Sequence, residues 1–193
     1  MKRDISNYIL KLEKFIDTDI CKNTIRELKK VPFETHKFYN LETGKEKPRS
    51  GKQELEVGTD EYADKISTNK IIMDKIFKSL EIYVGQYLNM PWFSYFNGFT
   101  PVRFNKYKKT RKMALHCDHI QSIFDGQRKG VPILSVVGLL NDDFKGGEFV
   151  MFDNFKVDLK EGDILIFPSN FMYPHKVESV TKGVRYSFVS WAW

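Results

Sequence analysis

The sequence contains little cysteine and no long apolar run. Cys21 and Cys117 are the two cysteines in 193 residues, too few for a disulfide framework, which favours a reduced intracellular setting. No segment approaches the roughly 20 apolar residues of a membrane-spanning helix, so we expect no membrane association. The first residues mix apolar and charged side chains and lack the apolar core of a secretory signal. These absences predict a cytoplasmic protein.

The sequence also shows no internal repeat and no linker that would divide it. Its hydrophobic content of 41% and charged content of 29% are typical of a globular protein and exclude wholesale disorder. A chain of 193 residues is long enough to bury a core of its own. We therefore expect one domain over residues 1–193, in which residues 1–100 supply supporting helices and N-terminal strands and residues 101–193 form the β core.

The first half of the chain favours helices and one loop. Residues 1–30 predict a helix or two, the second capped at Asn23 or Thr24, and residues 37–58 are polar and predict a long surface loop. Residues 59–88 predict the best helix, which Pro91 should end because proline disfavours helix before it. The apolar stripe expected in residues 1–30 consists of Ile9, Leu10, Leu12, Phe15 and Ile16. The stripe expected in residues 59–88 consists of Ile72, Ile76, Leu80, Tyr83 and Tyr87.

The second half of the chain has the pattern of short strands. Apolar, β-branched or aromatic runs occupy residues 131–141, 148–152, 162–168 and 185–193, and turn signals such as Gly146-Gly147 separate them. Several short strands broken by turns are typical of an antiparallel barrel or sandwich.

A metal site is predicted within these strands. In an extended strand, residues two apart project to the same face, so His116 and Asp118 can reach one ion while Cys117 points away. His175 could complete a set of two histidines and one carboxylate, which suits non-haem Fe(II). Arg185, ten residues after His175 (185 − 175 = 10), could bind a carboxylate through two parallel bonds. Each residue alone is more often an ordinary core or surface residue, and the combination is what indicates a site.

With these motifs the sequence resembles the prolyl 4-hydroxylase-like branch of the Fe(II)/2-oxoglutarate-dependent dioxygenases. The resemblance covers residues 104–193, about half of the chain. It is carried by Tyr107, His116-x-Asp118, Leu140-Asn141, Gly146-Gly147-Glu148, Lys160-Glu161-Gly162-Asp163, Phe167, His175, Arg185-x-Ser187 and Trp191. The family fold implies an α+β protein with a mainly β core, a double-stranded β-helix (jelly roll) flanked by N-terminal helices.

The resemblance also implies cofactors and site residues. Fe(II), 2-oxoglutarate and O2 are the expected cofactors, with ascorbate as a candidate reductant. The implied metal ligands are His116, Asp118 and His175. The implied cosubstrate ligands are Arg185, Ser187 and Tyr107. Trp191 is expected near the substrate, although a core tryptophan on the last strand explains its position equally well.

The implied reaction is hydroxylation of a peptide or protein side chain, with proline the leading candidate, coupled to oxidative decarboxylation of 2-oxoglutarate to succinate and CO2. The chain departs from many prolyl hydroxylases at Lys108-Lys109-Thr110, Met113 and Leu139, where the family has a glycine, a tyrosine and an aromatic residue. These changes alter the pocket walls. The same chemistry on a nucleic acid, an amino acid or a small metabolite therefore stays open, as does a non-catalytic β-helix binding module.

A basic cluster is the sequence support for a nucleic-acid partner. The net charge is +6, and Phe104 and Tyr107 are interleaved with this cluster. Basic runs with aromatic residues can contact phosphates, but a solvated loop or edge strand has the same composition. The cluster consists of Arg103, Lys106, Lys108, Lys109, Arg111 and Lys112. Substrate identity and oligomeric state are not determined by the sequence.

Overall fold

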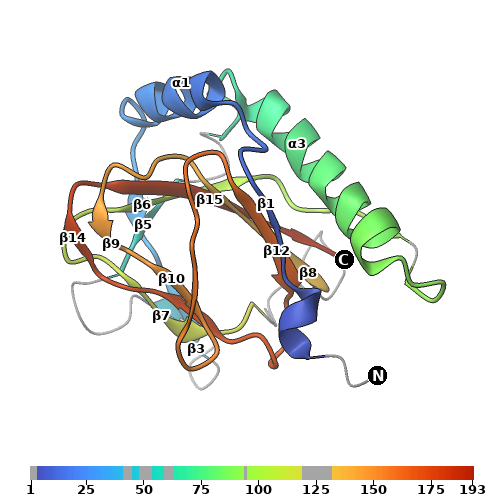
Figure 1. Cartoon of the computed structure of the whole chain (residues 1–193). Coiled ribbons are helices and arrows are strands. Elements are labelled where there is room, and N and C mark those ends of the chain that lie inside the picture. The colour runs from blue at the N-terminus through green and yellow to red at the C-terminus, as the bar shows by residue number, and fades with distance from the viewer. Residues whose placement is uncertain (1–3, 41–44, 48–53, 59–62, 94, 119–131) are drawn as a thin grey trace.

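The computed structural model describes residues 4–40, 45–47, 54–58, 63–93, 95–118 and 132–193. Two antiparallel sheets wrap around a common interior, and two helices lie outside the larger sheet (Figure 1). The larger sheet has the strand order β1 (Leu10–Leu12), β12 (Ile164–Pro168), β8 (Leu134–Leu139), β15 (Arg185–Ala192), β6 (Arg103–Tyr107), β5 (Glu56–Val57) and β2 (Glu34–Thr35). The smaller sheet has the order β11 (Phe155–Val157), β10 (Phe149–Met151), β13 (His175–Val177) and β7 (Met113–His116).

The remaining elements are two short ribbons and the helices. One ribbon joins β14 (Val180–Lys182) to β9 (Lys145–Gly146), and the other joins β3 (Phe38–Asn40) to β4 (Lys45–Lys47). The helices are α1 (Thr18–Leu28) and α3 (Asn69–Ile82), with a short 3₁₀ turn η1 (Ile5–Tyr8) near the N-terminus. A π-helical turn, η2 (Tyr83–Leu88), continues α3. No helix in the described residues has the length and apolar character needed to cross a bilayer.

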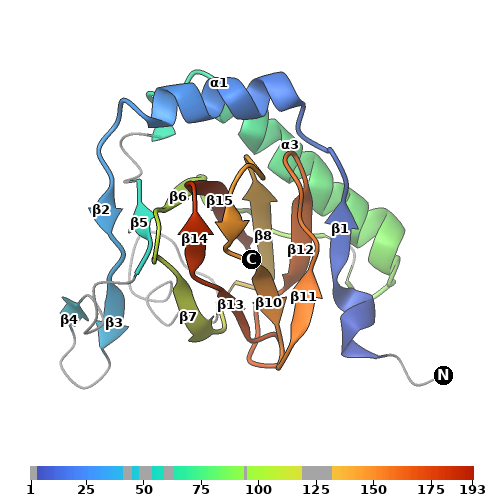
Figure 2. The same cartoon turned by 60° about the vertical axis from the view of Figure 1, so that its left-hand side comes forward.

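Strand β15 organises the two sides of the larger sheet. All eight of its residues are buried, because helices cover one face of the sheet and the smaller sheet faces the other. Successive side chains point to opposite faces, so Tyr186 and Phe188 pack in the outer core, while Val189 and Trp191 pack in the inner one. Figure 2 shows α1 and α3 crossing the outer side of this sheet.

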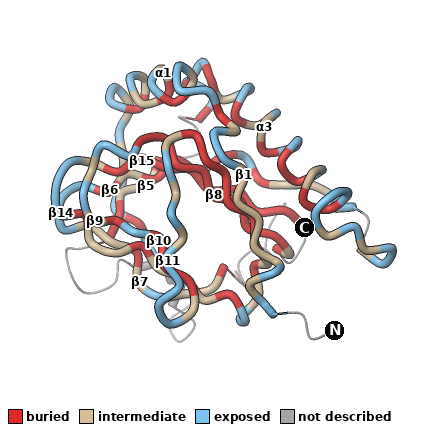
Figure 3. The backbone as a smooth tube through the Cα atoms, viewed as in Figure 1, coloured by how far each residue is buried: buried red, intermediate tan, exposed pale blue. Residues whose placement is uncertain are grey.

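The outer core explains why the best predicted helix forms. Ile72, Ile76, Leu80 and Tyr83 recur at spacings of four and three and are all fully buried, whereas Tyr87 is 40% exposed. Figure 3 shows burial along the sheet-facing side of α3 and along β8 and β15. The helical segment ends at Leu88, before Asn89, whose φ of 45° is left-handed, and Pro91 follows as predicted.

Several expectations need correction in the first half of the chain. Leu10–Leu12 is not helical but pairs antiparallel with β12, and α1 begins at Thr18 rather than near Asn23. The segment predicted as a loop over residues 37–58 contains β3, β4 and β5, and β5 pairs with β6. Strands of two or three residues are too short to show a periodicity, which is why the sequence pattern missed them. In the predicted helix, α3 begins at Asn69, and residues 59–62 lie outside the described ranges.

The predicted strands of the second half are confirmed. Strands β8, β10, β12 and β15 lie within residues 131–141, 148–152, 162–168 and 185–193, and they pair antiparallel in the two sheets.

Candidate active site

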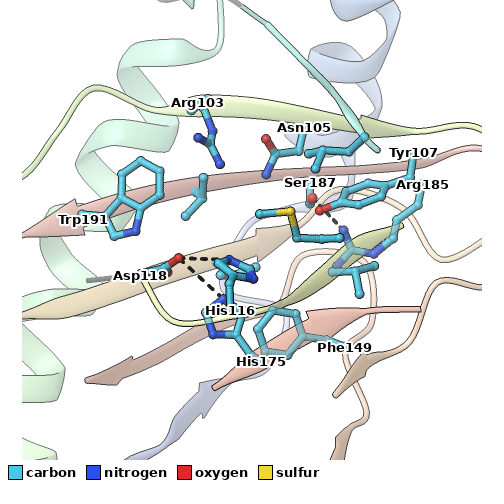
Figure 4. Close-up of a pocket in the computed structure, with 15 residues that line it drawn as sticks. Arg103, Asn105, Tyr107, His116, Asp118, Phe149, His175, Arg185, Ser187 and Trp191 are labelled. Atoms are coloured by element: carbon cyan, nitrogen blue, oxygen red, sulfur yellow. Dashed lines mark hydrogen bonds and ion pairs between the residues drawn. The ribbon is translucent and has the colours of Figure 1, made fainter. Parts of the chain in front are cut away.

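The predicted metal ligands meet at the inner edge of the smaller sheet. Strands β7 and β13 are neighbours, with His116 and His175 directly opposite each other, and their ring centroids are 4.3 Å apart. Asp118 follows two residues after the end of β7. Its Oδ1 lies 3.3 Å from His116 Nε2 and 3.7 Å from His175 Nε2 (Figure 4). The structure thus brings all three residues together.

Backbone carbonyls fix the tautomer of both histidines. His116 Nδ1 donates to the Ala114 carbonyl at 2.8 Å, and His175 Nδ1 donates to the Tyr173 carbonyl at 3.1 Å. A carbonyl can only accept, so the proton of each neutral ring sits on Nδ1 and the Nε2 lone pair faces Asp118. Histidines that bind metals are commonly oriented by such a bond from their second nitrogen.

The electrostatics favour the metal-binding forms of His175 and Asp118 at neutral pH. Burial lowers the pKa of His175 below its ordinary value. Burial by itself would raise the pKa of Asp118, but attraction to His175 and His116 when their rings are protonated, together with the hydroxyl of Ser135, outweighs it and holds the pKa of that carboxyl below its usual range. Ser135 Oγ donates to Asp118 Oδ2 at 2.7 Å. Asp118 therefore stays an acceptor at neutral pH.

The residues present fit a divalent metal. The three ligand atoms lie within 4.8 Å of one another, and two nitrogen lone pairs and a carboxylate oxygen repel unless a cation stands between them. Two histidines and one carboxylate leave coordination positions open, which suits non-haem Fe(II). The aromatic rings of Phe149 and Phe167 lie 5.2 Å and 4.9 Å from the His175 ring and hold it in place. Cys117 is not part of the cluster, as its strand parity predicted.

A buried cation stands on one side of this cluster. Arg185 is 1% exposed, its Nη1 donates to Ser187 Oγ at 2.7 Å, and its guanidinium lies 5.0 Å from the centroid of the Tyr107 ring. Within the described part of the chain, no carboxylate pairs with Arg185, and its Nε–H has no hydrogen-bond partner. Burial lowers the pKa of Arg185 and raises the pKa of Tyr107. A buried guanidinium without a counterion is suited to bind an anion.

Two motifs from the sequence hold Arg185 in place. Asn141 Oδ1 accepts from the Tyr186 backbone N–H at 2.7 Å, and its Nδ2 donates to the Val184 carbonyl at 2.8 Å, so it fixes the residues on both sides of Arg185. Gly147 has a φ of +68°, and a Cβ there would lie 3.2 Å from Arg185 Cδ. The Leu140-Asn141 and Gly146-Gly147 motifs therefore position the arginine.

The opposite side of the pocket was only partly predicted. Trp191 lines it, together with Arg103, Asn105 and Leu55, which the sequence pattern did not assign to a site. On β6, the alternation of Arg103, Asn105 and Tyr107 at every second residue was the signal that could have found Arg103 and Asn105. Figure 4 shows these β6 side chains above the metal cluster.

The basic cluster is divided by the structure. Arg103 faces the pocket, with its Cζ 4.8 Å from the centroid of the Trp191 ring. Lys106 Nζ and Lys108 Nζ lie 3.8 Å and 2.9 Å from the carboxylate of Glu56 on the neighbouring strand. The cluster is thus not a continuous free basic surface.

The part of the chain that carries the candidate site also matches a known protein family. Residues 102–193 match the family model described as the 2OG-Fe(II) oxygenase superfamily. Residues 102–193, just under half of the chain, are thus similar to this superfamily. It is similar to a PKHD-type hydroxylase of Idiomarina loihiensis, 33% identical over 93 residues, which are 47% of this chain and 40% of that protein. A PKHD-type hydroxylase of Aliarcobacter butzleri is 35% identical over 97 residues, covering 47% of this chain and 41% of that protein. The matches thus span about two fifths of these relatives.

Solved structures share the fold over nearly the whole chain. A prolyl hydroxylase of Trichoplax adhaerens, solved with a hypoxia inducible factor peptide fragment, has a TM-score of 0.73 at 15% identity and covers 97% of this chain and 84% of its own. A Pseudomonas putida prolyl-4-hydroxylase has a TM-score of 0.60 at 18% identity, with coverage of 96% and 91%. The predicted double-stranded β-helix fold with flanking helices is therefore confirmed.

Proposed function

We propose that this chain is an Fe(II)- and 2-oxoglutarate-dependent dioxygenase that hydroxylates a peptide or protein side chain, with proline the first residue to test. One observation carries the proposal. Three candidate ligand atoms converge in the same pocket as Arg185, a buried arginine that has no carboxylate partner among the described residues. A metal chelate and a carboxylate clamp are what a 2-oxo acid cosubstrate requires from its binding site.

In this proposal His116, Asp118 and His175 hold the metal through the atoms that already face one another. Bound Fe(II) would supply dioxygen activation coupled to oxidative decarboxylation of 2-oxoglutarate to succinate and CO2. The protein orients the ligands through the Nδ1–carbonyl bonds and excludes water with Phe149 and other apolar walls. Ser135 holds the second oxygen of Asp118, so the first stays directed at the metal position.

The cosubstrate ligands follow from the same pocket. Arg185 would bind the far carboxylate of 2-oxoglutarate and give its unsatisfied Nε–H a partner. Ser187, two residues along β15, already accepts from Arg185 and can donate its own proton to that carboxylate. Tyr107 lies against the guanidinium and closes the pocket on this side.

Three considerations favour a peptide or protein substrate. The structural relative from Trichoplax adhaerens was solved with a peptide fragment, and the Pseudomonas putida relative is a prolyl-4-hydroxylase. Glu56 partly neutralises the basic cluster, which weakens the case for a phosphate backbone. None of the lysines of the basic cluster is among the described residues that line the pocket.

Succinate formation tests the proposal. Purified protein is supplied with Fe(II), 2-oxoglutarate, ascorbate and air, with and without proline-rich peptides, and succinate and hydroxylated peptide are quantified by mass spectrometry. We expect peptide-stimulated succinate in the wild type and none in Asp118→Ala. Turnover that no peptide stimulates would leave the oxygenase chemistry and remove the peptide substrate. Absence of both turnover and Fe(II) binding would overturn the proposal.

A further inference from the structure

The wall of the pocket that runs from Ser187 toward Trp191 is built by two neighbouring strands. In the antiparallel pairing of β6 with β15, Asn105 lies opposite Ser187 and Arg103 lies opposite Val189. Trp191 follows two residues beyond Val189 on the same inward-facing side, and all of these side chains line the pocket. Figure 4 shows Asn105 and Trp191 on either side of Arg103, above the metal cluster.

Asn105 and Trp191 each bring into this wall a polar atom that lacks a hydrogen-bond partner among the described residues. Asn105 is 6% exposed and Trp191 is 7% exposed, and both line the pocket. Asn105 Oδ1 and Trp191 Nε1 are buried and make no hydrogen bond to any described residue. A buried donor or acceptor left unsatisfied costs about 1–3 kcal/mol, so retention of one of each in a single pocket points to a ligand that supplies the complements.

The direction of the indole N–H is set by its neighbour. Arg103 lies over the face of the Trp191 ring, with its Cζ 4.8 Å from the centroid, within the range of a cation–π contact. The contact fixes the plane of the ring, and a fixed plane gives the Nε1–H bond one direction. The donor is therefore preorganised before any substrate enters.

We propose that Asn105 and Trp191 form a two-point subsite for the backbone of an extended peptide. Trp191 Nε1 donates to one backbone carbonyl, and Asn105 Oδ1 accepts from a backbone N–H farther along the peptide. A polypeptide is the substrate class that carries both groups in a regular repeat. The inference rests on the proposed function and deepens it, because it names which residues recognise the substrate.

The spacing sets the length and composition of the segment. Asn105 stands opposite Ser187, four residues from Trp191 along β15, so the backbone positions of the two residues are offset by roughly 13 Å at about 3.3 Å per strand residue. About four residues of extended peptide match this offset. Proline has no backbone N–H, so the residue that binds Asn105 is not proline. The enzyme should therefore prefer mixed sequences to a run of prolines.

Peptide binding measured apart from turnover tests the subsite. A fluorescein-labelled proline–alanine repeat and a labelled oligoproline of equal length are titrated against protein carrying Fe(II) and 2-oxoglutarate under anaerobic conditions, and fluorescence polarisation gives the dissociation constants. We expect the proline–alanine peptide to bind at least about tenfold more tightly than the oligoproline, the effect of one neutral hydrogen bond. Trp191→Phe and Asn105→Leu should each weaken the proline–alanine peptide about tenfold. Trp92→Phe is the matched control, because that indole is 80% exposed, and it should change nothing.

Methylation of the peptide backbone tests whether Asn105 Oδ1 accepts from a peptide N–H. Methylating one alanine nitrogen at a time removes single N–H groups; one position should weaken binding to wild type about tenfold and have no further effect in Asn105→Leu. Equal binding of both peptides, or an unchanged affinity in Trp191→Phe, would overturn the subsite. The subsite would also be overturned if calorimetry showed binding of 2-oxoglutarate while neither peptide bound. That outcome would leave the proposed oxygenase chemistry standing. Failure to bind Fe(II) and 2-oxoglutarate would instead overturn the proposed function.

Discussion

The two faces of β15 differ in the chemistry of the side chains that they carry. On the outer face, Tyr186 and Phe188 pack under α1 and α3 in the larger hydrophobic cluster. On the inner face, Arg185, Ser187 and Trp191 place a cation, a hydroxyl and an indole N–H into a pocket. Residues one position apart on one strand thus serve different purposes, because a strand sends alternate side chains to opposite sides.

The two faces contribute differently to stability, because the outer side chains bury apolar surface while some inner polar groups lack a hydrogen-bond partner among the described residues. The outer side chains gain free energy from the loss of apolar surface to water. Arg185 Nε and Trp191 Nε1 on the inner face are buried without a partner among the described residues, and the same holds for Asn105 Oδ1 on β6. Unsatisfied buried groups lower the stability of the free protein. The outer face therefore stabilises a scaffold in which the inner face remains prepared for ligands.

Removal of a metal ligand on the inner side should have the largest effect on metal binding and turnover. Asp118→Ala deletes the oxygen that both histidines face, so the protein should bind Fe(II) more weakly. Turnover should fall roughly a thousandfold or more, which corresponds to a loss of several kcal/mol of transition-state stabilisation. The melting temperature of the metal-free protein should change little, because the repulsion among the three ligand atoms is relieved. Fe(II) titration, succinate assay and thermal unfolding measure the three quantities.

Asp74→Ala is the matched control, because Asp74 forms an exposed ion pair with Lys70 on α3. It should leave metal binding and turnover unchanged. Retention of wild-type Fe(II) affinity in Asp118→Ala would show that the carboxylate is not a ligand.

Removal of an outer side chain should lower stability and leave metal binding intact. Phe188 is fully buried opposite Gly138, whose missing side chain leaves room for the ring. Phe188→Ala should lower the free energy of unfolding by about 3–5 kcal/mol through lost burial and a cavity, while the remaining folded fraction binds metal normally. Urea denaturation measures the loss. Phe171→Ala, at a 79% exposed phenylalanine, should change it by less than about 0.5 kcal/mol. A small loss at Phe188 would contradict the division between the faces.

Replacement of the buried arginine should separate stability from function on a single side chain. Arg185→Met keeps the length and removes the charge, so 2-oxoglutarate affinity should fall about a hundredfold, the effect of lost charge-assisted bonds. The unfolding free energy should stay constant or rise, because an unpaired buried charge is replaced by an apolar group. Calorimetry and urea denaturation are the measurements. Arg26→Met makes the same charge change on the exposed side of α1. A large loss of stability in Arg185→Met would assign the arginine a structural role.

The sequence predicted those parts of the fold and site that depend on short-range pattern. Alternation placed His116 and Asp118 together, and the strands of the second half were found because they are short runs rich in apolar residues and separated by turn signals. The spacing of Ile72, Ile76 and Leu80 predicted the helix that covers the outer face. These features are visible because the period of the pattern equals the period of the structure.

What the sequence did not show depends on pairing between distant segments. Leu10–Leu12 resembled a helix, but the edge of β12 gives it hydrogen bonds as a strand. Leu55 lines the pocket because β5, two residues long, pairs with β6. Arg103 was assigned to a basic cluster, and its stacking on Trp191, 88 residues later (191 − 103 = 88), shows that it faces the pocket. The strand pairings of Leu10–Leu12 and of β5 have no local signature, since tertiary pairing overrides local preference.

The smallest expected effect concerns a polar group on the outer side. Tyr83, in the π-helical turn after α3, is fully buried, and its hydroxyl donates to the Tyr8 carbonyl at 2.7 Å. Burial raises the pKa of this tyrosine above its ordinary value, so the hydroxyl stays a donor at any pH of interest. Because this donor is satisfied, unlike the N–H of Trp191, Tyr83→Phe should cost about 1 kcal/mol of unfolding free energy. It should leave Fe(II), 2-oxoglutarate and peptide affinities at their wild-type values.

Tyr95→Phe is the control for this change, because Tyr95 is 70% exposed, and it should alter neither stability nor binding. Thermal unfolding of the two variants gives the difference, and calorimetry gives the ligand affinities. If Tyr83→Phe left stability unchanged and weakened a ligand, polar groups of the outer side would be coupled to the site. A loss of stability alone would show that buried hydrogen bonds serve the scaffold on one face of β15 and ligands on the other.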